Sequence, residues 1–125
     1  MLHDAYGNEV ETDRAETVAA IDRFAHSLIA YGTDFGVIFE AVEADPECVM
    51  ARGHAALLGL FMENNHGSTR AAAHLAAGSA LVAGGKGTAR EQAYFRAVDA
   101  AARHDVATAT GLHEELADQW PRDLF

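Results

Sequence analysis

The last third of the chain has the clearest periodic pattern of apolar and polar residues. Thr88 can cap the start of a helix, and Glu91 stands three residues later, which is the spacing of a capping box. The apolar residues that follow recur with helical period, at Ala93, Tyr94, Ala97, Val98 and Ala101. This pattern predicts a helix over about 89–103.

A second helical pattern follows an interruption at His104 and Asp105. Asp105 belongs to the residue types that cap helix starts, and Pro121 cannot continue a helix. Between them the apolar residues again have helical spacing, at Val106, Ala109, Leu112, Leu116 and Trp120. The two segments together predict a helical hairpin.

Four more helices are expected upstream, over about 13–31, 35–44, 47–63 and 71–83. Gly32 is expected to end the first of them in the left-handed conformation. Thr33 or Asp34 can cap the second, and Ser68 can cap the fourth. The third is apolar on nearly every side, so it should lie at the centre of the molecule.

Strands are not expected, because no segment alternates apolar and polar residues with period two. Residues 1–12 are polar and contain a turn signal, and they are expected to form an extended arm before a helical domain over 13–125. Helical hairpins this small cannot bury their apolar faces alone and need neighbours of the same kind. The predicted fold is therefore all-α: a tetratricopeptide-like right-handed α-solenoid of about three hairpins and six helices. The hairpins are expected over about 13–45, 46–84 and 87–121.

The negative net charge of the chain argues against two classes of binding partner. Nine basic and nineteen acidic residues give a formal net charge of −10, which argues against binding to nucleic acid or to an anionic membrane. The charge is uneven, at −9 over residues 1–47, +3 over 48–90 and −4 over 91–125. The middle of the chain is expected to be the most buried part.

The single cysteine, Cys48, excludes an intrachain disulfide and favours a reducing compartment. There is no run of about 18 apolar residues that could span a membrane, and no hydrophobic signal near the start. We therefore expect a cytoplasmic protein. Cys48 would be an activated nucleophile if the first turn of the third helix lowered its pKa, but the role of a small buried hydrophobe is favoured.

Histidines suggest the main alternative, a small helical oligomeric enzyme or metal-binding protein. His54, Glu63 and His66 lie on or between the third and fourth predicted helices, and zinc needs three or four converging ligands. Nothing in their spacing enforces that convergence. His54 and His74 are instead expected to fill small gaps, each with one ring nitrogen hydrogen-bonded, so no metal, cofactor or catalytic residue is predicted.

Candidate binding residues are the polar side chains on or at the end of the first helix of each hairpin, where stacked hairpins form a groove. They are Arg23, His26, Arg52, Asn64, Arg96 and Asp99. Arg90 and Glu91 form a separate polar pair in the first turn of the fifth helix. Glu91 favours the helix dipole there, and Arg90 is expected to act as a structural clamp on an acidic neighbour from the third or fourth helix.

Three segments resemble the N-terminal region of the tetratricopeptide repeat protein 38 family, in order and in spacing. They are Asp4 to Gly7, Asp45-Pro46 followed by Val49 to His54, and Thr88 to Gln92. The resemblance covers most of the chain and implies an α-solenoid of tetratricopeptide-like hairpins without established catalytic activity, so no functional residue is carried over. The chain departs from the tetratricopeptide pattern in the turn of the last hairpin, which has His104-Asp105 where Gly-Asp is usual.

The expected function is that of a non-catalytic interaction or scaffold module whose partner is a protein or peptide. Members of the family are several times longer, so the last predicted hairpin lacks a covering neighbour. Self-association through the C-terminal hairpin is therefore expected as well.

Overall fold

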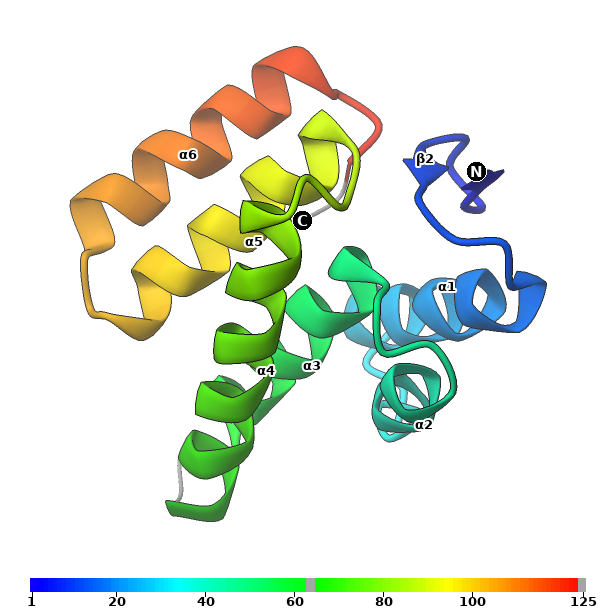
Figure 1. Ribbon diagram of the computed structural model, residues 1–125, viewed down its shortest axis with the longest axis horizontal. Coiled ribbons are helices and arrows are strands. Elements are labelled where there is room, and N and C mark those ends of the chain that lie inside the picture. The colour runs from blue at the N-terminus through cyan, green and yellow to red at the C-terminus, as the bar shows by residue number, and fades with distance from the viewer. Residues whose placement is uncertain (63–64, 124–125) are drawn as a thin grey trace.

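The computed structural model describes residues 1–62 and 65–123, with only the backbone described at residues 65 and 66. Within this part of the chain there are six α-helices and two very short strands (Figure 1). The predicted all-helical fold with six helices is confirmed. The elements are β1 (Leu2–His3), β2 (Glu9–Val10), α1 (Ala15–Ile29), α2 (Val37–Ala44), α3 (Val49–Phe61), α4 (Asn65–Ala83), α5 (Ala89–Ala102) and α6 (Val106–Gln119).

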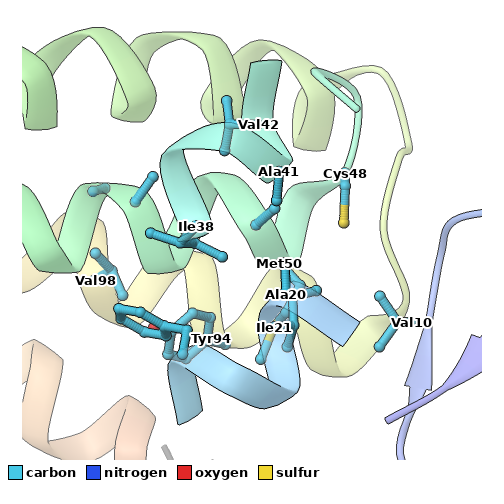
Figure 2. Close-up of a cluster of buried hydrophobic side chains, with 14 of the residues drawn as sticks. Val10, Ala20, Ile21, Ile38, Ala41, Val42, Cys48, Met50, Tyr94 and Val98 are labelled. Carbon is cyan, nitrogen blue, oxygen red and sulfur yellow. The ribbon is translucent and has the colours of Figure 1, made fainter. Parts of the chain in front are cut away.

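Helix α3 packs against α4, α5, α2 and α1, as its apolar sequence predicts. Two glycines allow its neighbours to approach closely. A Cβ at Gly53 would lie 2.7 Å from Tyr94 Cε1, and one at Gly59 would lie 2.8 Å from the carbonyl oxygen of Gly67. Figure 2 shows the core that results, to which α1, α2, α3 and α5 contribute Ile21, Ile38, Met50, Tyr94 and Val98.

Helices that are adjacent in the sequence pack in pairs: α1 with α2, α3 with α4, and α5 with α6. Helix α3 links the pairs, because it contacts α1 in the preceding pair and α5 in the following one. In Figure 1 the α5–α6 pair and the α1–α2 pair lie on opposite sides of α3 and α4.

The N-terminal arm is a β-hairpin, so the expectation that the chain has no strands was wrong. Strand β1 pairs antiparallel with β2, with Leu2 opposite Val10. In the turn between them, Asp4 Oδ1 accepts hydrogen bonds from the backbone N–H groups of Tyr6 (3.0 Å) and Asn8 (2.8 Å). Strands of two residues are too short to show an alternating pattern, which is why no periodic signal marks them.

Several predicted helix boundaries differ from the observed ones. Tyr31, not Gly32, has the left-handed conformation after α1, with a φ of 53°. Neither Thr33 nor Asp34 caps α2, whose N-cap position is Gly36. Helix α4 begins at residue 65, so Ser68 lies inside it and does not cap it.

The caps of the last two helices are those predicted. The Thr88 hydroxyl accepts from the Glu91 N–H at 3.2 Å, and Glu91 Oε2 accepts from the Thr88 N–H at 2.7 Å. Asp105 caps α6 by accepting from the Thr108 N–H at 3.2 Å. Before it, His104 has a φ of 58°, so this residue adopts the left-handed conformation for which glycine is the usual choice.

Candidate functional site

Arg90 is the most extensively bonded buried cation among the described residues, with only 4% of its side chain exposed. Its Nη1 donates to Asp123 Oδ2 at 2.7 Å, and its Nη2 donates to the backbone carbonyl of Glu9 at 2.9 Å. Asp4 Oδ2 lies 3.9 Å from Nη2. The guanidinium therefore holds together the start of α5, the N-terminal hairpin and the turn after α6.

The predicted clamp role of Arg90 fits these contacts, but the predicted partners were wrong. The expected partner was an acidic neighbour from the third or fourth helix, whereas the carboxylates come from Asp4 and Asp123, near the two ends of the chain. Nothing in a local pattern marks those residues, because the pairing spans most of the sequence. Only the fold brings them to α5.

Glu91 extends the same contact region and is fully buried. Besides closing the capping box with Thr88, it accepts the backbone N–H of Glu11 on both carboxylate oxygens, each at 3.2 Å. Glu11 in turn accepts from the backbone N–H of Gly87. Burial raises the pKa of Glu91, and the hydrogen bonds oppose that shift. These contacts fasten the arm to the first turn of α5.

A small cavity beside this network is too small for a substrate. It measures about 10 Å³ and is lined by side chains that include Asp4, Asp22, His54 and Arg90. A volume of that size holds about one water molecule at most. This cavity therefore offers no binding site, and the contacts of Arg90 are those of a structural clamp.

The two candidate reactive side chains in the core, His54 and Cys48, are buried and packed against their neighbours. His54 is fully buried between Phe24 and Tyr94, and its Nδ1 lies 2.8 Å from the Tyr94 hydroxyl, which confirms the prediction of a hydrogen-bonded gap filler. Burial, aided by the charge of Arg90, lowers the pKa of His54 to about 3. Burial raises the pKa of Cys48 to about 12, so the helix start does not activate this thiol.

The proposed metal ligands are not all described. Glu63 lies outside the described residues, and so does the His66 side chain. No group of three or more His, Cys, Asp or Glu residues in the described part of the chain is arranged to hold a metal ion.

The predicted groove residues on α1 occupy the side of the molecule near α2. Arg23 lines a hollow of about 570 Å³ between these two helices. It also donates from Nε to Asp34 Oδ2 at 2.8 Å, so its charge is paired. His26 is exposed on the same helix.

The remaining predicted groove residues lie elsewhere. On α5, Arg96 donates to Gln92 at 3.4 Å, and Asp99 accepts from Arg103 at 2.5 Å. Arg52, on α3, lines a different hollow from Arg23. Asn64 lies outside the described residues.

The hollow that contains Arg52 is lined by two arginines and a histidine. It measures about 370 Å³, lies where α2, α3 and α4 meet, and is lined by Phe39, Val42, Glu43, Pro46, Arg52, Arg70 and His74. We call it the basic hollow. None of the ion pairs among the described residues involves Arg52 or Arg70.

The side chains of the basic hollow are held in place by one another. Arg52 Nε donates to the Pro46 carbonyl at 3.0 Å, and its Nη1 lies 3.2 Å from His74 Nδ1. The His74 ring stacks on Phe39 with centroids 6.0 Å apart, and the Arg70 guanidinium lies 4.9 Å from the centre of the Phe39 ring. These contacts link the side chains of Arg52, Arg70 and His74 to the wall of the hollow.

His74 is neutral near pH 7 in this setting. Partial burial lowers its pKa, and the charges of Arg52 and Arg70 lower it further. Because arginine can only donate, the His74 Nδ1 must accept from Arg52, which leaves the proton on Nε2. His74 thus presents an N–H donor beside two guanidinium groups.

Arg52 is predictable as a candidate from the sequence, but its association with Arg70 and His74 is not. Arg52 and His74 are 22 positions apart on different helices, and only the packing of α3 on α4 brings them together. The excess of basic residues over positions 48–90 is the one available signal, and on its own it suggested burial and not a binding site.

Comparison with known proteins identifies no relative. The chain matches no family model, no curated protein and no solved structure. Among the helices in the described part of the chain, none combines the length and apolar character needed to cross a membrane.

Proposed function

We propose that the chain is a non-catalytic interaction module, built as a right-handed tetratricopeptide-like solenoid of three helical hairpins and related to the tetratricopeptide repeat protein 38 family. The observation that supports this proposal most directly is the order of packing. Sequential helices pair as hairpins, and the first helices of the hairpins contact one another, α1 with α3 and α3 with α5. In a solenoid each repeat is stabilised by its neighbours in this way, and the stacked first helices form the binding surface.

The burial and the contacts of the potentially reactive side chains also favour a binding role over a catalytic one. Cys48 and His54 are completely buried, and their pKa shifts keep both neutral at pH 7. Arg90 and Glu91 serve the clamp that holds the arm to α5. The alternative of an oligomeric metal enzyme around His54, Glu63 and His66 therefore gains no support from His54.

Self-association through the C-terminal hairpin is part of the proposal, with Val106 as its most exposed apolar residue. Val106 is 70% exposed, whereas Leu116 is buried and Leu112 and Trp120 are partly buried against the core. The apolar surface available to a second copy is therefore narrower than the apolar face that the sequence predicts for this helix.

The binding surface can be tested with two matched variants. His26→Glu with Arg96→Glu reverses or adds charge on α1 and α5, and Thr110→Glu adds a charge to the exposed face of α6. Immobilised wild-type chain and both variants are compared by mass spectrometry of the proteins each retains from an extract of the source cell. The proposal predicts a partner that binds the wild type and the α6 variant but not the α1–α5 variant.

Equal retention of every protein by all three chains, at equal melting temperatures, would contradict the proposed binding face. Metal analysis and thiol titration of the purified chain test the competing enzyme hypothesis. Stoichiometric zinc or iron, or a thiolate of Cys48 that titrates below neutral pH, would favour the enzyme.

A further inference from the structure

We infer that the basic hollow between α2, α3 and α4 is a binding site for a doubly charged oxyanion of the phosphate type. The inference goes beyond the proposed interaction module, since it concerns a different surface and a small ligand. It rests on three side chains that converge from two helices: Arg52 from α3, and Arg70 and His74 from α4.

The hydrogen-bond donors of these side chains are only partly used within the protein. Arg52 donates from Nε to the Pro46 carbonyl and from Nη1 to His74. Its Nη2 group therefore remains available to donate to a ligand. Arg70 contacts Phe39 through a cation–π interaction, which uses its charge but none of its five N–H donors. His74 adds the N–H of Nε2.

The charge of the site suits a dianion better than a monoanion. Two guanidinium groups carry two positive charges, and the neutral imidazole adds a donor without a further charge. Arginine is suited to phosphate because its planar fork can form paired, charge-assisted hydrogen bonds to two oxygens. A carboxylate would satisfy one guanidinium and leave the charge of the other uncompensated.

Purely structural roles do not account for both arginines. Arg52 buttresses the start of α3 through Pro46, but Arg70 is exposed and makes no hydrogen bond or ion pair among the described residues. The protein carries a net charge of −10, yet among the described residues Glu43 is the only carboxylate that lines this hollow. The negative charge of Glu43 should oppose the binding of an anion. Removing that charge should therefore strengthen binding, whereas removing an arginine should weaken it.

The volume of the hollow, about 370 Å³, exceeds that of a phosphate ion and lies at the lower end of the range for small-molecule sites. Part of its wall is apolar, formed by Phe39, Val42 and Pro46. The phosphate group can therefore be free phosphate or part of a larger molecule. Free phosphate, phosphoserine and adenosine monophosphate distinguish these sources when compared as probes.

The test measures binding of inorganic phosphate to the full chain at pH 7.5 by NMR chemical-shift titration, with acetate and chloride at matched ionic strength as controls. Arg70→Gln is the principal variant, because Arg70 is exposed and its loss should leave the fold intact. Arg96→Gln, at an exposed arginine on α5, is its matched control. Glu43→Gln tests whether removal of the negative charge strengthens phosphate binding.

We expect phosphate to shift the resonances of Arg52, Arg70 and His74 saturably, and acetate to do so at least tenfold more weakly. Loss of a charged hydrogen-bond donor should weaken phosphate binding by about tenfold or more in Arg70→Gln. Arg96→Gln should bind like the wild type, and Glu43→Gln should bind more tightly. A stronger response to phosphoserine or adenosine monophosphate would show that the apolar wall contributes and would identify the group as part of a larger ligand.

Two results would overturn the inference. One is a phosphate response no larger than that of acetate at equal ionic strength. The other is equal weakening by Arg70→Gln and Arg96→Gln, which would mean that phosphate only screens the general charge of the protein. Neither result bears on the proposed protein-binding face on α1 and α5, so the two proposals can fail separately.

Discussion

Replacing Arg90 with methionine should destabilise the protein far more than the loss of any exposed charged residue. Methionine has a similar length and fills much of the same space, so the change removes the charge and the hydrogen bonds while limiting the cavity. Three contacts are lost, to Asp123, to the Glu9 carbonyl and to the more distant Asp4. These contacts join both ends of the chain to α5.

The expected cost follows from the burial of the two carboxylates. Asp123 has 2% and Asp4 8% of its side chain exposed, so neither can regain water while the chain ends stay in place. Removing one partner of a buried ion pair typically costs about 3–5 kcal/mol, because the remaining charge stays in a poorly solvated position. That is a large part of the ~5–15 kcal/mol that stabilises an ordinary domain.

Urea unfolding followed by circular dichroism measures this cost as a difference in the free energy of unfolding. Arg96→Met is the matched control on the same helix, since Arg96 is exposed, and it should change stability by no more than about 0.5 kcal/mol. Adding Asp123→Asn to Arg90→Met should recover part of the loss, because it removes one of the stranded charges. A cost below about 1 kcal/mol for Arg90→Met, or no recovery in the double variant, would refute the clamp.

Three further predictions concern packing and protonation. Gly78→Ala should cost about 1–3 kcal/mol in urea unfolding, because its Cβ would overlap the buried ring of Phe95, whereas Gly111→Ala, with open space around it, should gain up to about 1 kcal/mol from helix propensity. The pKa of His54 is about 3 in the folded protein, below its ordinary value, so only the unfolded chain takes up this proton as the pH falls. Stability should therefore fall by about 2 kcal/mol between pH 7 and pH 5, and this loss should be absent from His54→Gln in the same assay. Cys48 should react with a thiol reagent at pH 8 on the order of a hundredfold or more slowly in the folded protein than in urea, and fast labelling of the native chain would contradict its burial.

Local signals in the sequence predicted the local structure well where a side chain acts on its own helix. The capping box of Thr88 and Glu91 and the cap of Asp105 depend on residues three positions apart, and both are present. Prediction failed where the fold overrode the local preference. Tyr31 takes the left-handed position although glycine is adjacent, and α4 begins before Ser68 although the residues that precede Ser68 in the helix have low helix propensity.

The long-range contacts could not be predicted in the same way. The role of Arg90 was predictable from its place in a helix start, but its partners depend on how both chain ends return to α5. The basic hollow depends likewise on the packing of α3 against α4, which sets Arg52 beside His74. A single sequence contains no periodic pattern for such pairs, so their geometry becomes available only with the fold.

The positions of the arginines separate the groups that maintain the fold from those available to a ligand. Arg90 is enclosed by carboxylates, so its charge is compensated inside the protein. Arg52 and Arg70 face a hollow whose described lining contains one carboxylate, Glu43, and so an anion can compensate their charge. Because Arg52 lies on α3 and Arg70 and His74 lie on α4, a bound anion would connect the two helices of the second pair, as Arg90 connects the chain ends to the third pair. Phosphate should therefore raise the free energy of unfolding with the logarithm of one plus the ratio of the phosphate concentration to Kd, and it should still do so in a folded Arg90→Met variant, whose defect lies at the start of α5 and outside the hollow.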